Sequence, residues 1–175
     1  LGDSRLREAT PVNWSKMLAY SGLMAGRSRS PEVVSGIVGH CFDLDDVSIE
    51  QWVLRKVAIG DDQQTRLGQS NASLGNDTLV GSRVRDRSGK FILRVRNLSR
   101  QRFADFLPNG QDHQRLVKLV EFATREQLAY DLELQMRAQD IRPMQMGKDV
   151  RLGWNSFVTP EKSRRRPAVR IQIRR

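Results

Sequence analysis

A short glycine pattern occurs twice in this chain, and it restricts the possible folds more than any other feature. Residues 74–81 read Leu-Gly-Asn-Asp-Thr-Leu-Val-Gly, and residues 146–153 read Met-Gly-Lys-Asp-Val-Arg-Leu-Gly. The glycines are six residues apart in both copies, and the copies are 72 residues apart. Repetition at a fixed spacing indicates one structural unit that is used twice. Such a duplication is typical of a protein that presents two similar surfaces.

The repeated residues are predicted to form corners of the backbone. Glycine adopts positive φ angles or permits close backbone approach, and aspartate accepts backbone N–H hydrogen bonds within turns. The six residues that we assign to these structural corners are Gly75, Asp77, Gly81, Gly147, Asp149 and Gly153.

Each corner lies in a similar succession of predicted elements. The order helix, helix, strand, glycine-rich corner and strand occurs over residues 14–97 and again over residues 98–175, after a linker at residues 1–13. We therefore predict an α+β protein with two pseudo-repeated helix-helix-sheet modules. Their helices should cover one face of small antiparallel sheets.

Capping residues and periodicity predict the elements of the first module. Ser30 and Pro31 begin a helix whose apolar residues follow the i, i+3, i+4 spacing. Residues 47–54 read as a strand, on which Trp52 is expected to lie in the core.

The second module follows from the same signals. A short helix should begin at Asn97 or Ser99, and Asp112 should cap a longer one. Residues 130–136 alternate as a half-buried strand. Residues 168–174 should form an edge strand whose Val and Ile side chains point inward.

Positive charge is concentrated just after the two corners. The net charge is +10, of which residues 83–102 carry +7 and residues 161–175 carry +6, so the remainder sums to −3. Such segments favour an acidic partner, nucleic acid or an anionic membrane surface. The simpler alternative is two solvated faces and a disordered basic tail, and residues 161–167 are predicted to be exposed.

The sequence contains no recognisable motif for catalysis or metal binding. The single cysteine, Cys41, excludes an intramolecular disulfide. With no metal-ligand spacing around it, His40 is interpreted as a helix-end histidine and Cys41 as a small core residue. The sequence has no phosphate-binding loop, no nucleophile elbow and no apolar run of membrane-spanning length. We therefore predict no enzyme activity, cofactor, metal, small-molecule substrate or membrane span.

Basic and aromatic side chains near the corners are the candidates for partner contact. Trp154 is compatible with either a core or an interface position, since aromatic residues dominate binding hot spots. The candidates are Arg83, Arg85, Arg87, Lys90, Phe91, Trp154, Phe157, Arg164, Arg165 and Arg166.

Four segments resemble, in order, motifs of one known family. They are the helix-to-turn region at residues 20–24, the Gly-Ser-Arg-Val-Arg-Asp-Arg stretch within residues 79–91, Phe-Leu-Pro-Asn-Gly at 106–110, and Leu-Gly-Trp-Asn-Ser-Phe within 151–157. Together they resemble the TssG family (also called ImpH or VasB) of type VI secretion. The chain departs from that family at Arg85, Ser88-Gly89 and Phe157. The family's N-terminal half has no counterpart here, so we expect a fragment of a longer protein.

The resemblance implies a structural role. TssG-like proteins form a baseplate wedge with TssF, TssE and TssK, join a TssF pair, and hold TssK trimers through two extensions. It thus implies TssF-like, TssK-like and TssE-like partners, and a place in the bacterial cytoplasm in a complex docked at the inner membrane. From charge and duplication, we map the docking to the two basic segments.

A nucleic-acid-binding module is the alternative interpretation. It would place several basic side chains on phosphates, but exposed aromatic residues are not interleaved with them, apart from Phe91. The side chains concerned are Arg83, Arg85, Arg87, Lys90, Arg94 and Arg96.

Overall fold

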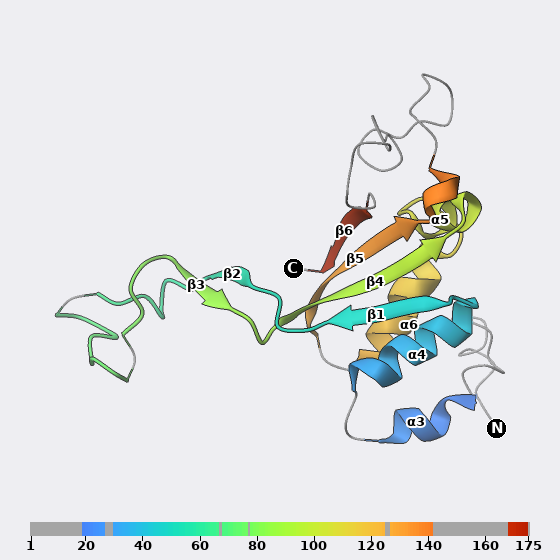
Figure 1. The fold of residues 1–175 in the computed structure, drawn as a ribbon. Helices are drawn as coiled ribbons and strands as arrows, with labels where there is room; N and C mark the ends of the chain where they lie inside the picture. The colour runs from blue at the N-terminus through green and yellow to red at the C-terminus, as the bar shows by residue number, and fades with distance from the viewer. Residues whose placement is uncertain are drawn as a thin grey trace.

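The computed structural model describes residues 19–26, 30–66, 68–76, 78–124, 127–141 and 168–174, and Figure 1 shows its ribbon. Helices cover one face of a four-stranded sheet, which confirms the predicted α+β class, and a two-stranded ribbon extends from the sheet. The elements are α3 (Ser21–Ala25), α4 (Pro31–Phe42), β1 (Asp46–Glu50), β2 (Arg55–Ala58), β3 (Arg83–Asp86), β4 (Lys90–Leu98), α5 (Arg100–Phe106), α6 (His113–Thr124), β5 (Ala129–Met136), the 3-10 helix η1 (Ala138–Asp140) and β6 (Ala168–Arg174).

The main sheet is mixed, which corrects the prediction of small antiparallel sheets. Its strand order is β1-β4-β5-β6, with antiparallel pairs at both edges and a parallel pair, β4 and β5, in the centre. A parallel pair requires a crossover connection. Here α5 and α6 supply it, because the chain leaves β4, forms both helices and returns to run beside β4.

The two pseudo-repeated modules are not confirmed. Each predicted module contributes one antiparallel pair, β1 with β4 and β5 with β6, but all four strands share one sheet. In the first half, β1 is the edge strand and β4 lies inside the sheet. In the second half, β5 lies inside and β6 is the edge strand. Consider each pair from the helix-covered face, with β1 and β5 drawn in the same direction. β4 then lies on one side of β1, whereas β6 lies on the other side of β5. No rotation superposes two such halves.

One hydrophobic core lies between the helices and the sheet. In α4 and α6 the buried residues recur at helical spacing, whereas β4 and β5 bury alternate residues on the helix-covered face. Burial of this kind is the main stabilising contribution to a domain. The central residues include Ile37, Val38, Leu93, Val95, Phe103, Phe106, Leu116, Leu119, Leu132 and Leu134.

Local capping begins the helices largely as predicted. The Ser30 hydroxyl accepts a hydrogen bond from the Val33 amide at 3.3 Å, and Pro31 occupies the first turn of α4. Ser99, not Asn97, caps α5 by accepting from the Arg102 amide at 3.3 Å. His40 lies in the last turn of α4, where its Nδ1 hydrogen-bonds with the hydroxyl of Tyr20.

The predicted strand at residues 47–54 is interrupted. β1 ends at Glu50, and Trp52 adopts a left-handed backbone conformation with φ of 59°. Its side chain is 61% exposed, so the prediction that Trp52 lies in the core is wrong. The reason is that the backbone turns at Trp52 before the next strand, β2, begins.

The C-terminal strand agrees with the prediction. β6 lies at the edge of the sheet against β5. Val169 is buried, and Ile171 and Ile173 pack against the core. Alternation along residues 168–174 therefore correctly predicted which side chains point inward.

Candidate partner-binding site

An arm, residues 52–89, extends away from the helices and the main sheet (Figure 1). β2 and β3 pair antiparallel along it, and residues 59–82 connect them. Two further hydrogen bonds extend the ladder: the Val53 amide donates to Lys90 O at 3.1 Å and the Ile59 amide to Ser82 O at 3.0 Å. The arm therefore continues the β1–β4 pair outward.

The pairing register changes where the arm leaves the sheet. Glu50 pairs with Ile92, and Arg55 pairs with Asp86. Between these two pairs the chain advances five residues from Glu50 to Arg55 but six from Asp86 to Ile92. The segment from β3 to β4 therefore contains one extra residue. Such an insertion is the defining feature of a β-bulge, which bends the strands and alters their twist.

Asp86 connects the two sides of this joint. Its carboxylate accepts from Arg55 Nε at 2.7 Å, from the Ser88 amide and hydroxyl at 2.8 Å each, and from the Gly89 amide at 3.3 Å. The Arg55 hydrogen bond, followed by those from Ser88, lowers the pKa of Asp86 to about 2. A Cβ on Gly89 would lie 2.1 Å from Nη2 of Arg55, so a larger residue there would displace the end of the Arg55 side chain.

The three predicted arginines of the arm are exposed. Arg83 and Arg85 lie on β3, and Arg87 follows it. Among the described residues, none of their side chains makes a hydrogen bond or ion pair. Their contact with a partner remains a prediction.

Two other candidates are occupied within the fold. Lys90 Nζ lies 2.8 Å from Asp131 Oδ2, and their side chains are 15% and 8% exposed. Phe91 is 6% exposed and stacks on Tyr130 with ring centroids 5.1 Å apart. The structure therefore places Phe91 in the core rather than at an interface, because β4 turns this side chain toward the helices.

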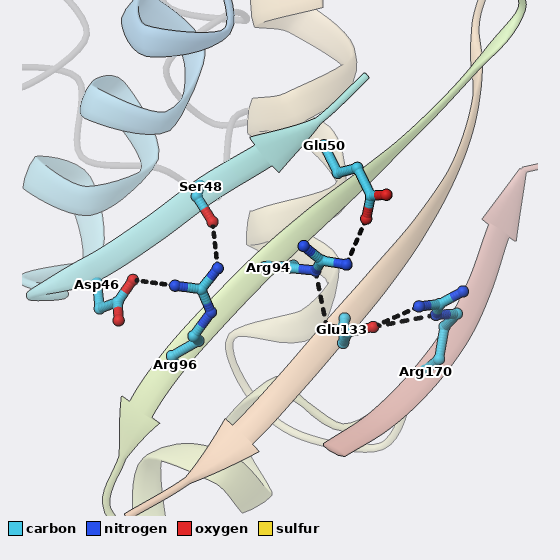
Figure 2. Close-up of polar contacts among 7 residues, drawn as sticks. All are labelled: Asp46, Ser48, Glu50, Arg94, Arg96, Glu133 and Arg170. Atoms are coloured by element: carbon cyan, nitrogen blue, oxygen red, sulfur yellow. Dashed lines mark hydrogen bonds and ion pairs between the residues drawn. The ribbon is translucent and has the colours of Figure 1, made fainter. Parts of the chain in front are cut away.

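The open face of the sheet carries a ladder of ion pairs (Figure 2). Arg96 contacts Asp46 Oδ1 at 3.3 Å and Ser48 Oγ at 3.0 Å. Arg94 bridges β1 and β5 by binding Glu50 and, at 2.9 Å, Glu133.

The ladder ends at the edge strand. Arg170 Nη2 lies 2.6 Å from the second carboxylate oxygen of Glu133, and this hydrogen bond raises the pKa of Arg170. Lys90, Arg94 and Arg96 were candidates for phosphate contact, but all three face internal carboxylates. Neutralised side chains release few counterions from a nucleic acid, so the ladder disfavours the nucleic-acid alternative.

The arm also exposes large apolar side chains that the sequence interpretation did not select. At its base, Trp52 and Leu54 are 61% and 46% exposed. In the distal loop, Leu74 and Val80 are 94% and 88% exposed. The sequence did contain a signal for the exposure of Leu74 and Val80. Both belong to the first glycine pattern, a predicted corner in which no core position is expected. These four side chains give the arm exposed apolar surface at both ends.

The first predicted corner has the expected backbone. Gly75 and Gly81 have φ angles of 83° and 97°, values that residues with a side chain rarely adopt. The remaining corner and tail candidates lie outside the described residues. They are Asp77, Gly147, Asp149, Gly153, Trp154, Phe157, Arg164, Arg165 and Arg166.

The described residues offer neither a metal site nor a membrane-spanning helix. Within the described ranges, no three His, Cys, Asp or Glu side chains are grouped so as to hold a metal ion. None of the described helices has the length and apolar character needed to cross a bilayer.

Comparisons with known proteins give one family match and one structural match. The family model described as "Type VI secretion, TssG" matches residues 1–159. The fold is similar to a chain in the cryo-electron-microscopy structure of the type VI secretion TssK-TssF-TssG baseplate subcomplex, with a TM-score of 0.71 and 17% identity. That match covers 99% of this chain and 72% of the other. Among curated proteins, none matches the sequence.

Proposed function

Because the chain belongs to the type VI secretion TssG family, we propose that it is a baseplate subunit that joins TssF-like subunits to TssK-like trimers. The observation that carries this proposal is the division of the molecule into a packed body and a protruding arm. An adaptor requires two surfaces that different partners reach without competing. The body offers one such surface and the arm the other.

The fold comparison supports the choice of partners. The similar chain comes from a subcomplex whose three named components are TssK, TssF and TssG. We assign TssF-like and TssK-like partners to this chain by that similarity, and a TssE-like partner by the composition of the wedge. In this role the chain is not an enzyme, and it acts in the cytoplasm in a complex docked at the inner membrane.

The arm is the docking element for the TssK-like trimer. An isolated two-stranded ribbon is only marginally stable in water. β2 and β3 pair over four residues each, and the exposed apolar residues lie at both ends of the arm. Contact with a partner would bury these side chains and hold the ribbon in one conformation. The second docking element is the basic segment Arg164–Arg166, together with Trp154 and Phe157, as the charge pattern predicts.

A shortened arm tests this assignment. Residues 60–81 are replaced by Asn-Gly, because Ile59 and Ser82 form a hydrogen-bonded pair that a two-residue turn connects. The full-length protein and the variant are each co-expressed with the TssK-like and TssF-like proteins of the same organism. We expect the variant to retain the TssF-like protein and to capture less of the TssK-like protein. Unchanged capture of the TssK-like protein would contradict a contact through the distal loop at residues 60–81, because the variant keeps β2 and β3.

A further inference from the structure

The register at the base of the arm decides which cation of β2 pairs with Asp86 and which lies among the arginines of β3. Residues directly opposite each other in an antiparallel pair project to the same face, and successive residues alternate. Arg55 is opposite Asp86, and Val57 is opposite Val84. On the other face, Lys56 is opposite Arg85.

The extra residue decides which of Arg55 and Lys56 lies opposite Asp86. If the register of β1 and β4 continued unchanged, Lys56 would face Asp86 and Arg55 would face Arg87. One face would then carry Arg55, Arg85 and Arg87, and on the other face Lys56 would have an ion-pair partner in Asp86. With the observed offset, Asp86 instead pairs with Arg55, and Lys56 lies opposite Arg85.

The two faces of the ribbon differ in exposure. On the first face Arg55, Val57 and Asp86 are partly covered, Val84 is 40% exposed, and Ile59, which continues the alternation, is 7% exposed. The opposite face, formed by Lys56, Ala58, Arg83 and Arg85, is exposed throughout. We call this second set the cationic face.

The cationic face has no internal compensation among the described residues. Like charges directly opposite each other in a sheet are unfavourable, and Lys56 and Arg85 have this arrangement with no carboxylate within ion-pair distance in the described part of the chain. An external anionic surface would remove the repulsion. The arrangement contrasts with the body, where Arg94, Arg96 and Arg170 all have carboxylate partners (Figure 2).

We propose that the cationic face docks on an acidic protein surface, and, resting on the proposed function, that this surface belongs to the TssK-like trimer. A protein fits better than a nucleic acid because exposed Trp52 and Leu54 adjoin the face and Val80 lies beyond it. Charge then directs the encounter, while the apolar side chains are buried in the complex. The sequence alone did not select Lys56, because its position opposite Arg85 depends on the register.

The test compares two charge reversals of equal size in the full-length protein. Lys56→Glu/Arg85→Glu changes the cationic face, and Arg100→Glu/Lys118→Glu changes exposed helix positions without ion-pair partners among the described residues. Association with the TssK-like trimer is measured by surface plasmon resonance at about 50 mM and about 300 mM NaCl. We expect the arm variant to associate about tenfold more slowly at the lower salt, with a weaker dependence on salt, and the control to match wild type.

The shortened arm separates the two proposals. If it loses the TssK-like protein while Lys56→Glu/Arg85→Glu associates at the wild-type rate, the cationic face is not the contact but the arm still is. If the shortened arm and Lys56→Glu/Arg85→Glu both bind the trimer normally, neither the distal loop nor the cationic face is the contact, and the proposed role of the arm fails. The third measurement uses a DNA duplex as probe. Binding to DNA that Lys56→Glu/Arg85→Glu abolishes, with association to the trimer unchanged, would overturn the assignment to a protein.

Discussion

At the scale of single residues, Asp86 holds the joint between the arm and the body. One carboxylate binds Arg55 across the ribbon and the turn at Ser88 and Gly89 along the chain. Because the charged form makes these contacts, their stabilising contribution is present above the ordinary carboxyl pKa of 3.8 and is lost as the pH falls through about 2. The contribution of Asp86 to the joint is therefore constant near neutral pH.

Removing Arg55 should raise the pKa of Asp86. In Arg55→Ala we expect the titration midpoint to move from about 2 toward 3.8, because the largest cause of the shift is removed. Carbon-13 NMR of the Asp86 carboxyl group measures this directly. Lys56→Ala is the matched control, since it deletes the neighbouring cation on the opposite face. An equal rise in both variants would show that the effect is not specific to the hydrogen bond.

At the scale of elements, the turn between α5 and α6 depends on close backbone packing. Asp105 O accepts from the Asp112 amide at 3.0 Å, and a Cβ on Gly110 would lie 2.1 Å from the same oxygen. Arg102 reinforces this corner by donating to Phe42 O and binding Asp112, both at 2.7 Å. This geometry gives a physical reason for the Phe-Leu-Pro-x-Gly motif at residues 106–110.

Substitution of that glycine should be costly. Gly110→Ala forces backbone atoms apart, and we expect a loss of about 1–3 kcal/mol in the free energy of unfolding, measured by urea denaturation. Gly36→Ala is the control, because a Cβ there has no neighbour within 4 Å and lies in the interior of α4. It should be neutral or stabilising by up to about 1 kcal/mol. Equal effects at the two positions would contradict the close approach at Gly110.

At the scale of the whole molecule, the two predicted halves share one sheet and one core. The parallel contact between β4 and β5 joins strands from residues 14–97 to strands from residues 98–175. Arg102 and Phe42 connect the same two segments through their hydrogen bond. Neither half buries its apolar surface without the other, so we propose that the body is a single folding unit rather than two modules.

A single folding unit should unfold in one transition. We expect far-UV circular dichroism of the helices and near-UV circular dichroism of the aromatic core to give coincident urea midpoints. Two transitions, or midpoints that differ between the probes, would instead support independent modules. The variant with the shortened arm serves as the control, because it leaves the core unchanged and should keep the transitions coincident.

Features that depend on neighbouring residues could be predicted from the sequence alone. Ser30 and Ser99 act within one helical turn, and the alternation of residues 168–174 decides which side chains face the core. Four short motifs in order were enough to indicate the family. Each of these depends on contacts or patterns that span only a few residues.

Features that depend on strand pairing were decided by the tertiary structure. Phe91 was a candidate for an interface and Trp52 for the core, but Phe91 is buried because pairing with β5 covers it, and Trp52 is exposed because the backbone turns there. Likewise, a one-residue offset determines whether Lys56 meets Asp86 or Arg85. The sequence lists the charges of the arm, whereas the register between two distant strands decides which of them remain free for a partner.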